Sequence, residues 1–318
     1  MLGRVIRPPF EIAAQDSVRN IIGIRTRWFI LTESGTHVKN CLASILNPLH
    51  SQFIPMRAAL NYNASPPELN VRYLIISDIH SNLEGLEKCL QLARGQYDQA
   101  ICLGDLVGYG PDPNAVVDRV REVASRVIRG NHDKACCGIS DAEDFNLLAR
   151  IGTLWTRQEL TPERQAFLRE LPSGPMAIDS FQIVHGSLAD EDEYIVNATQ
   201  ALPVLRGLKT QTVLFGHTHH QGGFVLNADG RFQSIHCDSR NDGRTLVLTL
   251  EDGGRYLINP GSVGQPRDGD WRAAFAIIDE GKREVEYFRT PYDLPKTQGK
   301  MVKAGLPEPL IRRLELGR

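Results

Sequence analysis

The sequence predicts a mixed α/β protein built as a four-layer α/β/β/α sandwich, with two sheets packed face to face between outer helices. The first half of the chain alternates short apolar strands with amphipathic helices, which is typical of βαβ units with parallel strands. The second half changes to shorter strands separated by hairpin signals, such as residues 227–230 and 251–254, which indicates mostly antiparallel pairing. Stacking one sheet on the other, with helices outside, buries the apolar faces of both.

The elements can be placed in order from position 71 onward. Residues 71–77 form a compact apolar run with the length of a buried strand. Asn82 is suited to cap the helix that follows, in which Leu83, Leu86 and Leu90 share one face. We expect further helices at about 114–124, 142–160 and 162–171, and further strands at 99–103, 126–128, 176–185, 212–216, 222–227, 232–236, 245–250, 255–259, 272–279 and 284–290.

The two ends of the chain differ from this central region. Residues 1–70 are poorly patterned, and their composition allows disorder. They fit a targeting or partner-binding extension, a simple appendage, or an upstream start codon with Met56 nearer the true beginning. We therefore divide the chain into an N-terminal extension (1–70), a folded domain (71–292) and a C-terminal helical tail (293–318).

Composition excludes several classes of protein. The 318 residues carry 36 Lys and Arg against 38 Asp and Glu, a formal net charge of −2, which argues against a dedicated duplex-DNA surface. No apolar run approaches the length that spans a bilayer, and the first residues hold no secretory signal. The six cysteines lack the spacing of a disulfide framework. The expectation is a reduced, cytoplasmic protein.

Polar residues stand where five of the apolar runs stop. Because strand ends of an α/β sheet converge on one edge, these residues are expected to meet where ligands usually bind. Each segment alone is weak evidence, since a single His after a strand is usually structural. Five polar segments that all occur at strand ends favour a metal site. The five segments are Asp78-Ile79-His80, Gly104-Asp105, Gly130-Asn131-His132-Asp133, His185-Gly186 and Gly216-His217-Thr218-His219.

This ordered set resembles the calcineurin-like metallophosphoesterase superfamily, over about residues 71–290. The segments 104–111 and 258–264 look like those of the compact prokaryotic phosphoesterases. Eukaryotic serine/threonine phosphatases have Asp-Arg-Gly in the second motif and Glu at the end of the third. This chain has Gly108-Tyr109-Gly110 and Asp133 instead, so it lacks the phosphate-binding arginine of those enzymes at that place.

The resemblance implies a dinuclear metal centre in which Asp105 bridges two ions. It also implies that His132 faces the leaving group, as a general acid or a hydrogen-bond donor. The ligand types, oxygen and imidazole nitrogen without thiolate, suit two divalent ions of Mn, Fe, Zn, Co or Ni. The implied ligands are Asp78, His80, Asp105 and His219 for one ion, and Asp105, Asn131, His185 and His217 for the other.

The resulting hypothesis is a phosphodiesterase acting on a small or nucleotide-like substrate through a hydroxide that bridges the two metals. A phosphomonoesterase or phosphoprotein phosphatase is the alternative. A non-catalytic binding scaffold is a third reading, which the intact ligand set disfavours. A nuclease would need a basic and aromatic groove, which the sequence lacks. No membrane partner is expected.

Other polar residues have structural explanations. Cys136-Cys137 is expected to pack rather than to bind metal, and His220 to face solvent or substrate. His236 is expected to be structural. Residues 259–262 are expected to form a turn that supports the ligand loops, and the basic residues of the tail to lie on a solvated helix face.

Overall fold

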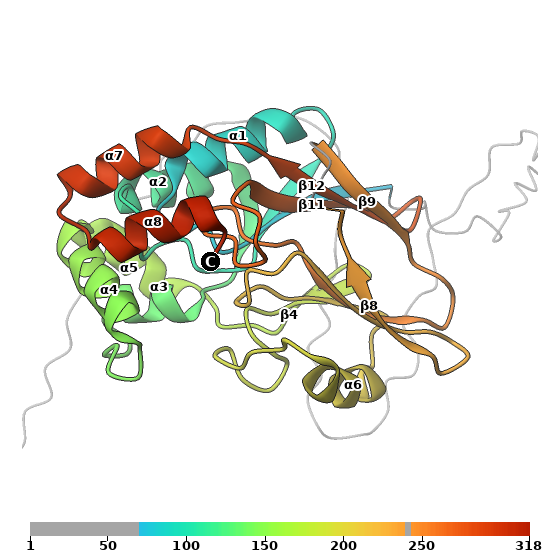
Figure 1. Cartoon of the computed structure of the whole chain (residues 1–318). Coiled ribbons are helices and arrows are strands. Elements are labelled where there is room, and N and C mark those ends of the chain that lie inside the picture. Colours follow the sequence, from blue (N-terminus) through green and yellow to red (C-terminus); the bar gives the residue numbers. More distant parts are fainter. Residues whose placement is uncertain (1–69, 239–242) are drawn as a thin grey trace, which may run out of the picture. The chain divides into compact units, whose positions relative to one another are not determined.

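Residues 70–238 and 243–318 are described by a computed structural model. Within them, one sheet has six strands, in the order β3-β2-β1-β11-β12-β9 (Figure 1). β1 pairs parallel with β2 and antiparallel with β11, so this sheet joins the start of the described chain to its later part. Its strands are β1 (Arg72–Ile76), β2 (Gln99–Cys102), β3 (Ala124–Val127), β9 (Gly243–Thr249), β11 (Ala273–Asp279) and β12 (Glu284–Thr290).

The second sheet of the described region also has six strands, in the order β4-β5-β6-β10-β7-β8. Its centre is parallel, because β6 pairs parallel with both β5 and β10, whereas the outer pairs are antiparallel. Its strands are β4 (Met176–Ile178), β5 (Phe181–Ile183), β6 (Thr212–Leu214), β7 (Gly222–Leu226), β8 (Phe232–His236) and β10 (Arg255–Asn259).

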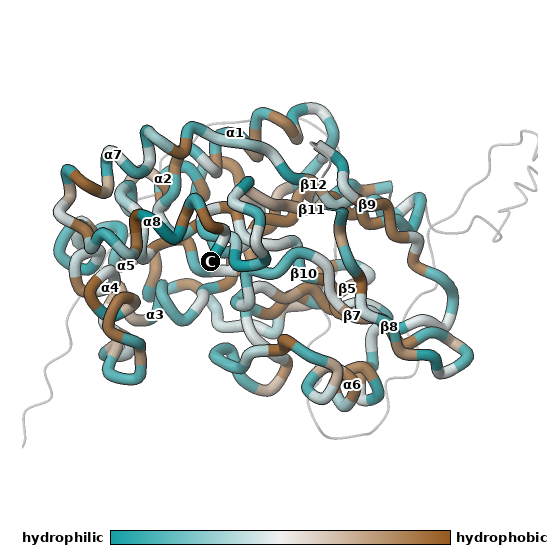
Figure 2. Tube along the Cα trace, in the orientation of Figure 1, coloured by the Kyte–Doolittle hydropathy of each residue, from teal (hydrophilic) through white to brown (hydrophobic). Residues whose placement is uncertain are grey.

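Helices lie outside both sheets, so the predicted four-layer sandwich is confirmed. α1 and α2 cover the sheet of β1, whereas α6 lies on the sheet of β10 (Figure 1). Hydrophobic residues gather on the strands and many loops are hydrophilic (Figure 2). The helices are α1 (Leu83–Ala93), α2 (Pro113–Val123), α3 (Asn131–Cys136), α4 (Leu147–Glu159), α5 (Pro162–Glu170), α6 (Ala198–Gly207), α7 (Leu294–Lys303) and α8 (Glu308–Leu316).

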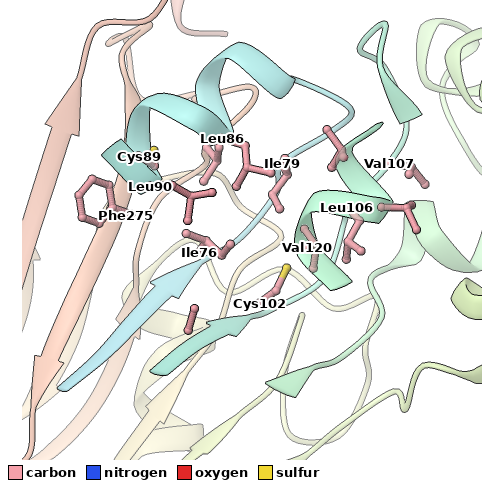
Figure 3. Close-up of a cluster of buried hydrophobic side chains, with 14 of the residues drawn as sticks. Ile76, Ile79, Leu86, Cys89, Leu90, Cys102, Leu106, Val107, Val120 and Phe275 are labelled. Carbon is pink, nitrogen blue, oxygen red and sulfur yellow. The ribbon is translucent and has the colours of Figure 1, made fainter. Parts of the chain in front are cut away.

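The packing of α1 shows how the sequence pattern becomes a layer. Asn82 caps this helix as predicted, because its side chain accepts a hydrogen bond from the Gly85 N–H at 3.0 Å. Leu86 and Leu90 then pack into a buried cluster that includes the β1 residue Ile76 and the β11 residue Phe275 (Figure 3). The cap and the apolar stripe hold the chain just after β1 in place, and that segment carries the first motif.

The C-terminal helices α7 and α8 pack against the same domain. Leu310 and Leu314 of α8 form a buried cluster with Tyr109, which lies in the second motif. Lys300 of α7 forms ion pairs of 2.7 Å with Glu84 of α1 and with Asp112, the residue before α2. Lys300 therefore does not lie on a simple solvated face, in contrast to the expectation for the basic tail.

Several sequence predictions need correction. The second half pairs mostly antiparallel, as predicted, but β6 pairs parallel with β5 and β10, and its strands β9, β11 and β12 join the first sheet rather than a sheet of their own. The predicted helix at 142–160 begins only at Leu147, and the predicted strand at 176–185 is a hairpin of two short strands. Helices α3 and α6 were missed, since short helices next to loops leave little periodicity.

Within the described residues, no helix is both long and apolar enough to cross a membrane. The five cysteines in this part of the chain are free thiols. The predictions for the extension at 1–70 fall on residues that, but for Asn70, lie outside the described ones.

Candidate metal centre

The seven predicted ligand residues lie at one edge of the sandwich, where parallel strands end. β1, β2 and β3 are parallel neighbours in one sheet, and β5 and β6 are parallel neighbours in the other. The carboxyl ends of such strands deliver the following loops to a common edge. The ligand residues follow β1 (Asp78, His80), β2 (Asp105), β3 (Asn131), β5 (His185) and β6 (His217, His219).

The side chains form two buried groups that share Asp105. Within each group the candidate ligand atoms lie within 4.8 Å of one another. Asn131 adjoins the second group, because its Oδ1 lies 3.3 Å from Nε2 of His185. This is the division that the family resemblance implies. The first group is Asp78, His80, Asp105 and His219, and the second is Asp105, His185 and His217.

Five of these residues have a left-handed backbone conformation that residues other than glycine seldom adopt. Each such position costs about 1–3 kcal/mol and persists only where surrounding contacts enforce it. The main chain here is held in that way, since Asp78 N–H donates to Gly104 O and His80 N–H donates to Asp105 O. Strain concentrated on one set of polar side chains indicates a functional site. The positive φ values are 52° at Asp78, 47° at His80, 52° at Asp105, 64° at His217 and 60° at His219.

Backbone carbonyls orient the imidazole rings. Nδ1 of His80 lies 3.0 Å from Val107 O, and Nδ1 of His219 lies 2.6 Å from Gln265 O. A ring that donates from Nδ1 presents a lone pair at Nε2, and Nε2 of His80 faces Nε2 of His219 at 3.1 Å. Two lone pairs at this distance repel each other unless a cation lies beside both. This is the arrangement that metal-ligating histidines show.

The carboxylate of Asp105 supports the same interpretation. Its Oδ1 accepts a hydrogen bond from the His132 N–H at 2.9 Å, whereas its buried Oδ2 has no hydrogen-bond partner. Nε2 of His80 and of His185 lie 3.5 and 3.4 Å from that oxygen, too far for good hydrogen bonds. A buried, unpaired carboxylate oxygen is costly. Its position between the two groups fits an oxygen shared by two cations.

Gly130 allows this carboxylate to lie against the backbone of the third motif. A Cβ at Gly130 would come within 2.1 Å of Asp105 Oδ1, so any side chain there would displace the carboxylate. The glycine that precedes Asn131 is thus required for close approach.

Comparison with known proteins identifies the family. Residues 71–283 match the model of the calcineurin-like phosphoesterase superfamily domain. The chain belongs to this superfamily. An uncharacterised protein of Methanocaldococcus jannaschii is 34% identical over 256 residues, which cover 77% of this chain and 97% of that protein.

Two solved structures resemble this phosphoesterase over nearly their whole length. A metallophosphoesterase from Sphaerobacter thermophilus is 40% identical, with a TM-score of 0.68, and the match covers 78% of this chain and 99% of that one. A hypothetical protein from Pyrococcus horikoshii has the same coverage, with 20% identity and a TM-score of 0.61, and so shows the fold alone.

Hydrogen bonds from neighbouring loops support the phosphoesterase motifs. Ser262 Oγ donates to Asp78 O at 2.7 Å, and Asn259 Nδ2 donates to Gly216 O at 2.9 Å. The turn at 259–262 therefore supports the ligand loops, as predicted. Asp133 accepts from the N–H groups of Gly130 and Val107, at 3.0 and 3.1 Å, and ties the third motif to the second.

Burial and charge shift the titration of several groups in this site. Burial disfavours the charged form of His185, but Asp105 and Asp78 outweigh it and raise the pKa of His185 to about 10. Burial lowers the pKa of His132 to about 4, which Asp105 offsets only in part. Burial also raises the pKa of Asp133 to about 7, with Asp105 adding to the effect.

A cavity of about 380 Å³ opens beside the two ligand groups. Its lining includes Asn131, His132 and His217, and the loop at 140–146. The ring of Tyr194 stacks on His217 with centroids 3.8 Å apart, and Phe145 lies 4.6 Å from His132. The predicted residue His132 therefore lies at the boundary between the ligand groups and this cavity.

The sequence analysis missed several residues around this cavity. Tyr109 contacts the rings of His80 and His132, at 4.8 and 4.4 Å between centroids, and its place in the second motif was a usable signal. Tyr194 and Phe145 come from segments without a motif, so local pattern could not reveal them.

The residues that were expected not to bind metal lie outside the two ligand groups. His220 is exposed and joins neither ligand group, and His236 is exposed in β8. Cys136 and Cys137 are buried in the hydrophobic cluster under α1 and α2, which confirms their packing role.

Proposed function

We propose that this phosphoesterase is a dinuclear metal-dependent phosphodiesterase that hydrolyses a small or nucleotide-like substrate. The observation that carries the proposal is the pair of buried ligand groups joined by Asp105, whose Oδ2 has no hydrogen-bond partner. Asp78, His80, Asp105 and His219 would hold one ion, and Asp105, Asn131, His185 and His217 the other. Two divalent ions bound there would neutralise phosphoryl oxygens and lower the pKa of an attacking water.

His132 is positioned to assist the leaving group. Its N–H donates to Asp105, and its ring packs between Tyr109 and Phe145 at the cavity wall. Nδ1 lies 3.4 Å from Oγ1 of Thr153, which can hold the ring in one orientation. A ring fixed in this way can give a proton or a hydrogen bond to the oxygen that leaves phosphorus.

The cavity supports a small substrate over a macromolecular one. Its volume, about 380 Å³, is typical of small-molecule sites. Tyr109, Phe145 and Tyr194 can pack against a flat or apolar ester group. Acidic side chains on the same wall, Asp141 and Glu143 among them, disfavour additional negative charge in that part of the substrate. This combination favours a diester with an uncharged second ester group.

The test compares a matched diester and monoester. The protein reconstituted separately with Mn²⁺, Fe²⁺, Zn²⁺, Co²⁺ and Ni²⁺ is assayed on thymidine 5′-(4-nitrophenyl phosphate) and on 4-nitrophenyl phosphate, which share one leaving group. We expect a higher kcat/KM for the diester with at least one metal. The reverse order would indicate a phosphomonoesterase, and a phosphopeptide assay would then test the phosphoprotein alternative. Hydrolysis of neither ester with any metal would favour the binding scaffold.

A further inference from the structure

Two arginine side chains approach the Tyr109 ring next to the ligand groups. The Cζ atoms of Arg267 and Arg313 lie 5.8 and 5.7 Å from the centroid of that ring. Arg267 belongs to the loop after β10, and Arg313 belongs to α8. Two cations from distant parts of the chain thus lie beside one aromatic side chain of the second motif.

Neither arginine is neutralised by an acidic side chain of the described residues. Arg267 donates to Gln265 Oε1 at 3.1 Å, while its buried Nε has no partner. Arg313 donates from Nε to the main-chain oxygen of Arg318 at 2.6 Å. The nearby carboxylates are engaged elsewhere, since Asp268 pairs with Arg289 and Asp270 with Arg272.

The two cations also oppose each other. Burial, followed by the charge of Arg267, lowers the pKa of Arg313 from its usual value. Two half-buried guanidinium groups that no acidic side chain of the described residues neutralises are unfavourable, and an anion placed between them would relieve both their burial and their repulsion. Their planar donor groups suit phosphate oxygens in particular.

The arginine pair borders the metal centre. The N–H of Arg267 donates to the carbonyl of His219, a predicted ligand, at 3.2 Å. The Tyr109 ring that both guanidinium groups approach is itself 4.8 Å from the His80 ring and 4.4 Å from the His132 ring. An anion held by the pair would therefore adjoin a phosphoryl group bound at the metal centre, away from the acidic cavity wall.

We propose that Arg267 and Arg313 bind a second phosphate of the substrate, next to the phosphoryl group that is hydrolysed. This inference rests on the proposed function and narrows its substrate to phosphoesters that carry a further phosphate group. The uncharged ester group lies in the aromatic cavity, and the second phosphate lies on the arginine side.

The test measures binding, so it does not depend on turnover. Calorimetry on the Mn²⁺-loaded full chain compares methylenediphosphonate with methylphosphonate, which differ by one phosphonate group. We expect wild type to bind the diphosphonate about 10- to 100-fold more tightly, as for hydrogen bonds between charged groups. Arg267→Met and Arg313→Met each remove a guanidinium but keep an apolar stem, and each should reduce that ratio at least about 10-fold.

Arg312→Met is the matched control. Arg312 is exposed on the same helix and has only a 4.0 Å contact with Glu308, so its loss should leave the ratio unchanged. Arg267→Lys keeps the charge without the planar donors and should restore part of the preference. Melting temperature and metal content are measured for every variant. If Arg313→Met fails to fold, the affinity ratio of Arg267→Met alone tests the inference.

A wild-type ratio near one, or a ratio that Arg267→Met leaves intact, would overturn the inference. Failure of the proposed function gives a different result, because the wild-type protein would then bind these anions with the expected ratio yet hydrolyse neither ester of the matched pair, or prefer the monoester.

Discussion

Asp105 is the residue on which the candidate centre depends most. It is the member common to both ligand groups, it has a positive φ, and one of its oxygens is buried without a hydrogen bond. Each of these features is unfavourable in an ordinary loop, and together they fit the proposed role of Asp105 as a ligand shared by two cations. At the residue scale, the site combines local backbone strain with a buried carboxylate oxygen that lacks a hydrogen bond.

Asp105→Ala should therefore abolish activity and metal loading together. The substitution removes one ligand from each ion and leaves two cations with less negative charge between them. Elemental analysis of the purified variant should find fewer than two ions per chain. Two ions still bound to the variant would contradict the bridging role.

His132→Ala should separate catalysis from metal binding, because His132 lies beside the ligands without belonging to either group. We expect both metals to remain and the rate to fall about 10²–10⁴-fold. If His132 protonates the leaving oxygen, the loss should be greatest for leaving groups of high pKa. A series of esters with graded leaving-group pKa measures this, and an equal loss across the series would leave only a hydrogen bond to the phosphate.

At the element scale, the C-terminal helices complete the wall around the second motif. α8 packs Leu310 and Leu314 against Tyr109, and α7 is tied to α1 and to the start of α2 through Lys300. Glu84, one of the two partners of Lys300, is buried in the first turn of α1, and Asn82, two residues earlier, caps that helix. The segment that was predicted as a helical tail with a solvated basic face therefore contacts α1, the start of α2 and Tyr109 of the second motif.

Lys300→Met should reduce the free energy of unfolding by about 1–3 kcal/mol, because it leaves Glu84 and Asp112 without their common cation. Lys303→Met, at an exposed position of the same helix, is the control and should change stability little. Urea unfolding at pH 7 measures both variants. Equal stability of the two variants would show that the ion pairs contribute nothing net.

The loss of stability in Lys300→Met, measured against Lys303→Met, should depend on pH. Burial would raise the pKa of Glu84, but Lys300 and Lys296 outweigh it and hold that pKa below its usual value. A lowered pKa stabilises the fold above the unfolded pKa of about 4.3, and this stabilisation is lost as the pH falls through the folded pKa. The deficit of Lys300→Met should therefore shrink below about pH 4. A deficit that grows on acidification would contradict this assignment.

At the scale of the whole molecule, each sheet mixes segments that are distant in sequence. β1 lies between β2 and β11, and β10 lies between β6 and β7, so both sheets need the second half of the chain. The predicted ligands lie between Asp78 and His219, and the family match spans 71–283. The match to the M. jannaschii relative covers 97% of that protein and 77% of this chain.

Deleting residues 1–69 should accordingly leave turnover nearly unchanged. No predicted ligand and no strand of the two described sheets lies in that segment. The melting temperature should move by less than ~2–4 °C, the shift that a loss of about 1 kcal/mol produces in a domain of this size. Differential scanning calorimetry of the two chains tests this. A larger drop would mean that the deleted segment stabilises the domain.

The sequence by itself determined the features that are local. A short apolar run followed by a polar residue predicts a strand and a polar strand end, so all five polar segments could be located from local pattern. The assignment of seven ligands and of a role for His132 came from the family resemblance of those segments and stays a prediction. Asn82 was predictable as a cap for the same reason, because its side chain and the N–H group of Gly85 that it caps are only three residues apart. Such signals need only the covalent neighbourhood of each residue.

Only the tertiary structure decided the features that depend on pairing across the chain. Strand order depends on long-range hydrogen bonding that alternation within a strand does not specify, which is why β9, β11 and β12 were not assigned to the sheet of β1. Tyr194, Arg267 and Arg313 likewise lie in segments without a motif. Only after folding does Tyr194 meet His217 of the last motif, and do the two arginines meet Tyr109 of the second. The predicted metal ligands stand in short motifs at strand ends and so leave a local signal, whereas residues that contact the rest of a substrate need only converge on one cavity.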